Sequence, residues 1–488
     1  MNSLRILVAS AFLLFAFGLQ AQLVRQLSLE DVVAMARGQS SSSKQAETRR
    51  DNRYWQYKLY RSNYNPQLAL SGNVPGYNRD FLSNRLDDGT IVFQDREQLN
   101  SSLNLGLNQP IAFTGGNISV NTNLNYFQDI NQDLTRYNTT TYNVQLDQPL
   151  FGFNPLRWDK RTEPLRYEES RREYVEELEF LSREAVSYFF NLLNAQINEQ
   201  IASFNLVNND TIYKIEEGRY NIGTTSLDKL LQVELQLLRS QQDVAQAQLD
   251  RQIGNQQLRA YIAMSYADTM NLLVPQEIPS FEINMQDAIL YAKMNRADYI
   301  AFERRRLEAA REIAEARGQR FQTMLTASFG LNSASGGFDN AYEDPNRQQR
   351  VDIGLVVPIL DWGRNRARMQ TALANQQLND FVIDQDEQNF EQEIFTLVRQ
   401  FELLRNQLRI SRKSDEVAQE RYNVAQNRYL TGKVDITNLN IALSEKDEAK
   451  RSYINALRDF WLAFYDLRRL TLYDFASGQL LYVPGENE

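Results

Sequence analysis

Cysteine and histidine are both absent from the 488-residue chain, and each absence excludes a class of site. Without cysteine there is no disulfide framework and no cysteine at a processed N-terminus for a lipid to modify. Without histidine the chain lacks the commonest general base and the commonest metal ligand. Only carboxylate-based sites remain, since Ser–His and Cys–His nucleophile pairs are excluded. We therefore expect a protein that is not an enzyme and binds no cofactor or metal.

An excess of basic residues is lacking as well. Lys and Arg total 53 against 62 for Asp and Glu, which gives a formal charge of −9 and disfavours a nucleic-acid partner. Mean hydropathy is −0.52, and no long apolar run follows the first residues. Strands that alternate apolar and polar residues can still cross a membrane as a β-barrel and escape a hydropathy scan.

The N-terminal residues 1–21 are expected to lie outside the fold. Arg5 precedes an apolar run at residues 6–19, and the small residue Ala21 follows shortly after. The run is shorter than the about 20 residues that span a bilayer. The pattern predicts a secretory signal peptide cleaved after Ala21, so the protein is exported. The alternative is a buried N-terminal helix.

The two halves of the chain resemble each other, which indicates a duplication. At a constant offset of 209 positions, the matched residues are Pro149 and Pro358, Arg157 and Arg366, Arg219-Tyr220 and Arg428-Tyr429, Gly223 and Gly432, and Leu258-Arg259 and Leu467-Arg468. A looser match joins Asp31 and Ala36 to Asp287 and Ala292. Each half is predicted to contain a helix, strands, a very long helix, a tight turn and a further helix.

The long segments show a helical period. Apolar residues at alternating spacings of three and four are Leu178, Leu181, Ala185, Tyr188 and Leu192, and then Phe390, Ile394, Leu397, Phe401, Leu404 and Leu408. This pattern is typical of a coiled-coil seam, although an ordinary bundle core would also show it. Residues 156–222 and 364–431 would form rods of about 90 to 100 Å. Residues 27–63 and 226–262 are predicted to be shorter helices that stack into a rod of similar length.

Six runs alternate apolar and polar residues with a period of two. The runs are residues 68–74, 103–107, 118–126 and 142–146 in the first half, and 325–331 and 351–357 in the second. They predict strands with one apolar and one polar face, as in a membrane β-barrel or a soluble sandwich. The Asn-rich polar face favours the barrel. Aromatic residues near strand ends, expected as interface girdles, are Tyr64, Tyr126, Phe127, Phe151, Phe153, Phe321 and Trp362.

The connections between these strands set the size of the sheet. Residues 75–98, 128–139 and 333–348 are rich in Gly, Asn, Asp and Pro and are predicted to be exposed loops. Residues 111–116, with Gly115-Gly116, are long enough only for a tight turn. Six strands per subunit would give roughly 18 in a trimer, and a barrel's diameter grows with strand number. The alternative folds the extra hairpin 98–127 away as a collar or plug.

The order of several short motifs resembles the TolC-like outer-membrane efflux proteins. The motifs are Asn65-Pro66-Gln67-Leu68, Gln148-Pro149-Leu150-Phe151, Val357-Pro358-Ile359-Leu360-Asp361-Trp362-Gly363, Arg219-Tyr220-Asn221-Ile222-Gly223 and Arg428-Tyr429-Leu430-Thr431-Gly432. Each motif alone is weak, but their duplicated order is specific. The resemblance covers nearly the whole chain after the signal peptide. Familiar members have two strands per half, so the extra hairpin is a departure.

The resemblance implies a membrane β-barrel plus a long α-helical coiled-coil barrel, internally duplicated, that a homotrimer joins into one continuous duct. The barrel would lie in the outer-membrane lipid of a Gram-negative bacterium, and the helices in the periplasm. The implied partners are a periplasmic adaptor protein and an inner-membrane pump of the RND or ABC type. The expected function is the exit duct of a tripartite efflux or type I secretion system. Open sheet edges and uncovered helix seams also favour oligomerisation.

The resemblance also places functional residues at the tips of the helical hairpins. Candidate adaptor-docking residues are Arg219, Gly223, Leu227, Arg428, Gly432, Val434 and Ile436, and candidates for the periplasmic gate are Tyr220, Asp228, Tyr429, Asp435 and Asn438. The two glycines are predicted to adopt positive φ. Hydrogen bonds from tyrosine hydroxyls to carboxylates would latch neighbouring helices. The alternatives are a purely structural turn and exposed tip residues without a latch.

The chain departs from the family at the positions of its acidic rings. The positions that carry them, six and nine residues after the second hairpin glycine, hold Asn438 and Ile441. Asp435 lies nearby as a substitute.

The predicted boundaries follow from these elements. They are 1–21 for the signal peptide, 22–63 for the first periplasmic helix, 64–155 for the first strands, 156–275 for the first long hairpin with its tip near 223, 276–320 for the second periplasmic helix, 321–362 for the second strands, 363–471 for the second long hairpin with its tip near 432, and 472–488 for a C-terminal tail.

A structural periplasmic coiled-coil scaffold without transport is the competing hypothesis, and the alternating strands disfavour it. Two clusters of charged residues lie on predicted helices. The carboxylates of Glu176, Glu177 and Glu179, and the run Arg304-Arg305-Arg306, are each predicted to form a solvated helix face.

Overall fold

A computed structural model describes residues 24–264, 269–320 and 322–483, so the predicted signal peptide and Phe321 lie outside the described residues. The chain divides into two compact units. The first holds the residues up to Asp51, Ser170–Tyr299 and the residues from Glu387 onward. The second holds Asn52–Glu169 and Ile300–Asp386. No helix in the described part of the chain is long and apolar enough to cross a membrane.

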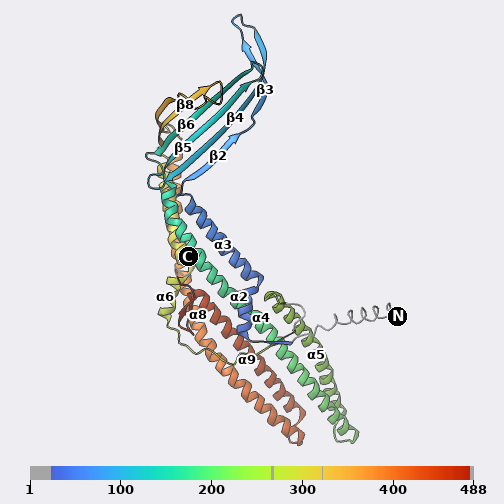
Figure 1. The fold of residues 1–488 in the computed structure, drawn as a ribbon. Helices are drawn as coiled ribbons and strands as arrows, with labels where there is room; N and C mark the ends of the chain where they lie inside the picture. Colours follow the sequence, from blue (N-terminus) through green and yellow to red (C-terminus); the bar gives the residue numbers. More distant parts are fainter. Residues whose placement is uncertain (1–23, 265–268, 321, 484–488) are drawn as a thin grey trace, which may run out of the picture. The chain divides into compact units, whose positions relative to one another are not determined.

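Helices account for most of the described chain (Figure 1). They are α2 (Leu29–Gln39), α3 (Ser41–Ser62), α4 (Pro155–Asn221), α5 (Leu227–Tyr261), α6 (Met285–Asn295), α7 (Ala297–Gly318), α8 (Arg364–Leu430) and α9 (Ile436–Thr471). The strands are β1 (Val24–Leu27), β2 (Gln67–Asn73), β3 (Tyr77–Arg85), β4 (Ile91–Ile111), β5 (Gly116–Asp129), β6 (Leu134–Pro149), β7 (Thr269–Leu272), β8 (Gln322–Ser335), β9 (Asn346–Val356), β10 (Tyr473–Asp474) and β11 (Gln479–Leu480).

The duplication predicted from sequence is visible in the helices. The helices α4 and α8 each contain 67 residues, and both their first and last residues lie 209 positions apart. The helices α5 and α9 begin at the same offset. The pairs α2 with α6 and α3 with α7 lie 256 positions apart, which is the offset of Asp31 and Asp287. The two long hairpins, α4–α5 and α8–α9, are therefore equivalent elements.

The predicted single helix 27–63 is wrong, because the chain changes conformation twice in this stretch. Strand β1 precedes a helix whose N-cap Ser28 forms a capping box with Asp31. The helix stops at Ser40, which is extended (φ −63°, ψ 151°). The Ser40 hydroxyl accepts a hydrogen bond from the Ser43 N–H at 3.0 Å, and this cap starts α3. Arg296, also extended, separates α6 from α7 in the same way, so the predicted helix in 276–320 is likewise two helices.

The main hydrophobic core lies in the first unit. It gathers apolar residues of α2, α4, α5, α8 and α9 against the parallel pair β1–β7. Phe189, Phe190 and Phe460 are fully buried there. The predicted C-terminal tail also belongs to this unit, because β10 and β11 form a short antiparallel pair beside α9 and Leu472 is buried.

The second unit contains a seven-stranded antiparallel sheet in the order β2-β4-β5-β6-β8-β9, with β3 also paired to β4. The predicted extra hairpin is thus part of the sheet, as β4 and β5. The predicted loop 75–98 is wrong, since most of it forms β3 and the first part of β4. The loops at 128–139 and 333–348 are shorter than predicted, because β5, β6, β8 and β9 extend into them.

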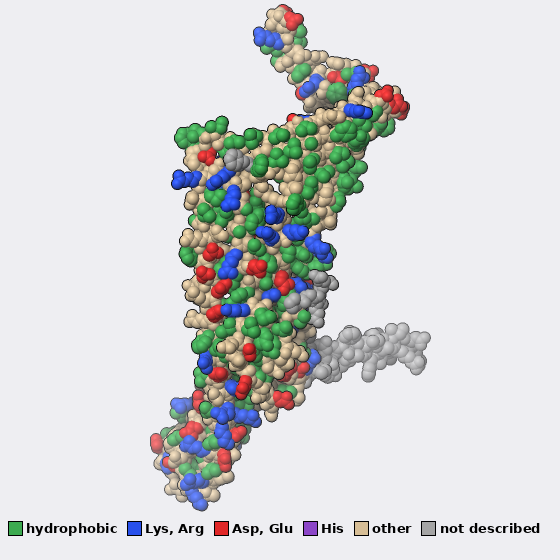
Figure 2. All heavy atoms as spheres, turned by 90° about the vertical axis from the view of Figure 1, so that its left-hand side faces the viewer, with side chains coloured by type: hydrophobic (Ala, Val, Ile, Leu, Met, Phe, Trp, Pro, Cys, Tyr) green, Lys and Arg blue, Asp and Glu red, His purple; other side chains and the backbone are tan. Residues whose placement is uncertain are grey.

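The register places the apolar residues of all six predicted runs on one face of the sheet. The facing pairs include Leu68 with Leu107, Leu107 with Val120, Val120 with Val144, Val144 with Phe329, and Leu325 with Ile353. This face is exposed in the single chain, with Leu70 at 70% and Val351 at 73% of full accessibility. In Figure 2, hydrophobic side chains form broad patches over the sheet, while acidic and basic side chains are mixed over the helices.

The opposite face of the sheet is polar. It lines a hollow of about 560 Å³, whose polar residues include Asn104, Asn121, Asn123, Asn143, Gln145, Asp147, Thr326, Gln348, Arg350 and Asp352. Asp147 accepts a hydrogen bond from the Thr326 hydroxyl at 2.8 Å. The sheet therefore has one apolar and one polar surface, as the alternation of its residues predicts.

Candidate functional site

Each long helix ends in the same tight turn at the tip of its hairpin. The N–H of Gly223 donates to the Tyr220 carbonyl at 2.9 Å, and the N–H of Thr224 to the Arg219 carbonyl at 2.9 Å. Gly432 and Lys433 repeat both bonds at 2.9 Å. This is the Schellman arrangement, in which the residue after the helix adopts positive φ. The prediction for both glycines is confirmed, with φ of +74° at Gly223 and +70° at Gly432.

The helices that follow these turns begin differently. Asp435 is the N-cap of α9, and its carboxylate accepts hydrogen bonds from the Asn438 N–H at 3.0 Å and the Asn438 side-chain amide at 2.9 Å. Its first-half equivalent, Ser226, makes no side-chain cap bond. Asp228 lies in the first turn of α5, where a negative charge suits the helix dipole. Two gate candidates, Asp435 and Asn438, are thus hydrogen-bonded to each other, and Asp435 caps the N-terminus of α9.

Tyr429 is buried between the two hairpins and is bonded to a residue that sequence reasoning missed. Its hydroxyl donates to Glu216 Oε1 of α4 at 2.9 Å. Arg219 approaches the same oxygen at 2.7 Å, and its guanidinium lies 5.6 Å from the Tyr429 ring centroid. Both Tyr429 and Glu216 are less than 5% exposed. We call Glu216, Arg219 and Tyr429 the tip latch, because the three residues join α4 to α8.

Electrostatics keep the tip latch in one protonation state at neutral pH. Burial alone would raise the pKa of Glu216, but hydrogen bonds from Tyr429, Thr225 and Arg219 outweigh it and lower that pKa. Burial and the bond to Glu216 raise the pKa of Tyr429 to about 12. The tyrosine therefore stays a donor and the glutamate a charged acceptor, which is a strong combination.

The other predicted tip residues divide between surface and core. Arg428, Leu227, Asp228 and Tyr220 are exposed, and Arg219 and Val434 are partly buried. Ile436 is only 7% exposed in the single chain, and its role as an adaptor-docking residue stays a prediction. As the first residue of α9, it faces the seam between the hairpins and packs in a cluster with Ile212, Val233, Tyr422, Tyr429, Leu439 and Leu443.

The predicted solvated face of acidic residues on α4 is wrong for two of its three members. Glu179 is fully buried and pairs with Arg37 at 3.1 Å and Arg468 at 2.8 Å. Glu176 accepts the N–H of Ala297, the first residue of α7, at 2.8 Å. Desolvation by burial raises the pKa of Glu176 to about 7. These carboxylates tie elements of the first unit together.

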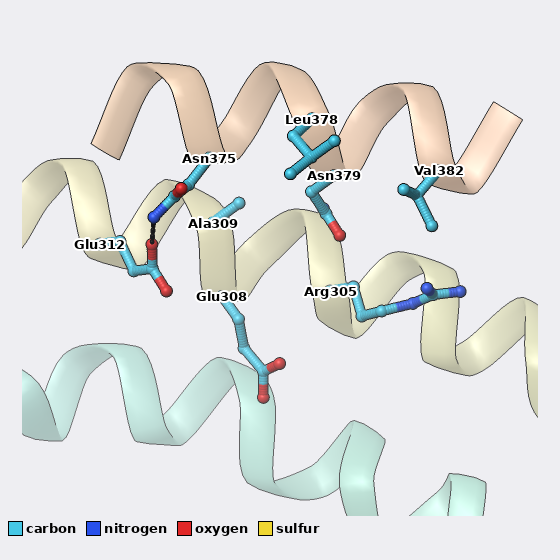
Figure 3. A pocket seen from close by; sticks show the side chains of 8 residues that line it. All are labelled: Arg305, Glu308, Ala309, Glu312, Asn375, Leu378, Asn379 and Val382. Atoms are coloured by element: carbon cyan, nitrogen blue, oxygen red, sulfur yellow. Dashed lines mark hydrogen bonds between the residues drawn. The ribbon is translucent and has the colours of Figure 1, made fainter. Parts of the chain in front are cut away.

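The predicted solvated face on α7 is wrong for Arg304 and Arg305, whereas Arg306 is exposed. Arg304 pairs with Glu169 at 2.5 Å and with Glu308 at 2.8 Å, and Arg305 with Asp386 at 3.0 Å. A groove of about 340 Å³ between α7 and α8 lies beside them (Figure 3). Glu312 on one side of this groove accepts a hydrogen bond from Asn375 at 3.4 Å. The described residues contain no cluster of His, Cys, Asp or Glu that could hold a metal ion.

Comparisons with known proteins agree with this architecture. The family model for outer membrane efflux proteins matches residues 118–263 and 293–471. No curated protein matches the chain. Among solved structures, the fold is similar to the Campylobacter jejuni CmeC outer membrane channel, with a TM-score of 0.67, 15% identity, and coverage of 94% of this chain and 88% of that one.

Two further channels have a similar fold. For CusC the TM-score is 0.63 at 16% identity, covering 94% of this chain and 95% of that one. For the outer membrane protein VceC of Vibrio cholerae it is 0.61 at 16% identity, covering 93% and 96%. The family model spans well over half of the sequence. The chain belongs to the outer membrane efflux protein family, whose members are non-enzymatic transport ducts of the Gram-negative outer membrane.

Proposed function

We propose that three copies of this chain form one duct, the outer-membrane exit of a tripartite efflux or type I secretion system. The observation that carries the proposal is the sheet, whose apolar residues share one exposed face while its polar residues share the other. Lipid would cover the apolar face, and each Leu or Ile removed from water contributes about 1.5–3 kcal/mol. A coiled-coil scaffold would need no such face.

The free edges of the sheet support closure by further copies. Strands β2 and β9 are the two ends of the strand order, and they run in opposite directions. Pairing β9 of one copy with β2 of the next would continue the antiparallel pattern and remove both edges. Three copies would then contribute roughly 18 strands to one barrel, not counting β3.

The tip latch is proposed as the periplasmic gate, and the exposed hairpin tips as the adaptor-docking surface. Tyr429 and Glu216 join the two hairpins of one chain, so separating the hairpins requires breaking their bond. An adaptor from the periplasm and an inner-membrane pump of the RND or ABC type would supply cargo to this end. The docking candidates remain Arg219, Gly223, Leu227, Arg428, Gly432, Val434 and Ile436.

Purified protein in detergent and in planar bilayers tests this function. We expect a trimer by light scattering and discrete conductance steps after reconstitution. Cells that lack the chain should accumulate the cargo of the partner pump. Expression of the natural chain in these cells should lower the amount of accumulated cargo. A stable monomer without conductance would contradict the proposal.

A further inference from the structure

We propose that Lys446 and Asp447 form a second latch between the two helical hairpins, and that this latch must break before the periplasmic end of the duct opens. The proposal rests on the proposed function as a gated duct. It concerns residues away from the hairpin tips, none of which belongs to the tip latch.

The second latch is a buried charged cluster on α9 that contacts α4 and α8. Asp447 accepts a hydrogen bond from the Asn205 amide of α4 at 2.7 Å. The Lys446 ammonium lies 3.3 Å from the other Asp447 oxygen. It also lies 4.1 Å from the ring centroid of Phe204 on α4 and 4.7 Å from that of Tyr422 on α8. The ammonium is therefore held between two aromatic rings, one from each hairpin.

The position of the cluster suits a role in gating. Asn205 lies about 24 Å along α4 from the helix end at Asn221, at 1.5 Å per residue. The tip latch lies between the cluster and the hairpin turn. If one hairpin slides past the other, the bond from Tyr429 to Glu216 and the bond from Asn205 to Asp447 must both break.

Burial strengthens the charged contacts of the cluster while the hairpins are packed together. The same contacts weaken once water reaches them. Lys446 is 9%, Asp447 5% and Tyr422 1% exposed. The Tyr422 hydroxyl and Asn205 Oδ1 are buried without a hydrogen-bond partner among the described residues. A buried polar atom without a hydrogen-bond partner costs free energy. Water that enters as the hairpins separate would hydrogen-bond to these atoms and recover that free energy. Opening is thus opposed by the charged contacts and assisted by rehydration, as a latch requires.

A neighbouring ion pair shows what an ordinary structural contact looks like. Lys450, one turn further along α9, pairs with Asp415 of α8 at 3.1 Å. This pair lies within a single hairpin, and Lys450 is 36% exposed. Because no sliding between hairpins would break it, the pair serves as a matched control.

The first test measures single-channel conductance of the assembled trimer. The double variant Lys446→Met with Asp447→Asn removes both charges while keeping volume and an amide partner for Asn205. We expect the fraction of time in the open state to rise about tenfold, because the bond from Asn205 loses its charged acceptor and the two aromatic rings lose their cation. The control variant Lys450→Met with Asp415→Asn should leave that fraction unchanged. An unchanged open fraction in the first variant, with assembly and melting temperature intact, would overturn the proposal.

The second test closes the same contact with a metal. The natural chain contains no His or Cys, so Asn205→His with Asp447→His creates a zinc-binding pair without background. Zinc should hold this variant closed, and a chelator should reopen it. The single variants Asn205→His and Asp447→His should not respond to zinc. This test keeps the proposal falsifiable if the first double variant does not assemble. A double-histidine variant that binds zinc while its channel stays open would overturn the latch.

The outcomes separate the latch from the duct itself. If Tyr429→Phe opens the channel and neither cluster variant does, the latch is wrong and the duct stands. If neither the natural trimer nor its Tyr429→Phe variant conducts ions, the proposed function is overturned, and the latch with it.

Discussion

At the scale of single residues, the buried charges mark where the two halves of the chain are tied together. Glu216 and Tyr429 join α4 to α8 near the tips, and Glu179 joins α2, α4 and α9 in the core of the first unit. Removing one partner of a buried charged pair is far more destabilising than removing an exposed one. These positions are therefore where substitutions should have measurable effects.

The tip latch predicts the effect of removing one hydroxyl. Tyr429→Phe deletes the donor to Glu216 and leaves the ring packed, so the hairpins should part more easily and single-channel conductance should rise. The loss of such a bond costs about 1.5–3 kcal/mol. Tyr220→Phe, at the exposed equivalent position of the first half, is the control and should conduct like the natural chain. Equal conductance of the two variants would argue against a gate at Glu216.

Glu176 predicts a pH dependence of stability. Its pKa in the folded protein is about 7, above the unfolded value of 4.5, because burial disfavours the charged form. The contribution of Glu176 to stability is complete below pH 4.5 and is lost as the pH rises through 7. Glu176→Gln should therefore stabilise the trimer at pH 8, by about 3 kcal/mol, and have little effect at pH 4.

Thermal melting of the detergent-solubilised trimer at the two pH values measures this difference. Glu177→Gln is the matched control, since Glu177 is more exposed and pairs with Arg49 at the surface. A stabilisation of the Glu176 variant that is equal at both pH values would show that the pKa is not raised.

At the scale of elements, the two hairpin turns predict a separable effect on export. Gly223 and Gly432 adopt positive φ, and a Cβ there would meet open space within 4 Å. A substitution would therefore strain the backbone by about 1–2 kcal/mol without a steric clash. Changing both to valine should abolish export in cells while membrane trimers persist. Fractionation for trimers and cargo accumulation measure the two effects, and normal export would place the docking surface elsewhere.

The elements also show how far sequence reasoning reaches. The long helices were predictable to within a residue or two, since their apolar period is unbroken. The break at Ser40 was not, because serine is tolerated in helices and only its extended backbone and its cap to Ser43 show that one helix ends and another begins. The strands in 75–98 were missed because turn-forming residues dominate that composition.

Glu216 escaped prediction for a different reason. The equivalent position in the second half is Ala425, so a search for duplicated residues passes over it. The only local sign was its spacing of three from Arg219, which suits an ion pair on one helix face. Cross-hairpin contacts depend on which helix faces pack together, and a single sequence does not specify that.

At the scale of the whole molecule, the proposed barrel predicts opposite environments for neighbouring residues of β5. Val120 lies on the apolar face and Asn121 on the polar face. A spin label at Val120 should report lipid, and one at Asn121 should report water. Each label requires its own variant, Val120→Cys or Asn121→Cys. The natural chain contains no cysteine, so labelling is specific to the introduced residue. Water at Val120 with Asn121 shielded would reject insertion of the extra hairpin into the membrane.

The unequal sheets of the two halves have a consequence for symmetry. The helices of the halves are close copies, so three chains would present six nearly equivalent hairpins, a pseudo-sixfold arrangement. The first half supplies β2 to β6 and the second only β8 and β9, so the strands repeat only with threefold order. An asymmetric cargo would meet six similar surfaces among the helices and three among the strands. In the proposed trimer, the exit path of the cargo would therefore be divided into fewer, broader sectors among the strands than among the helices.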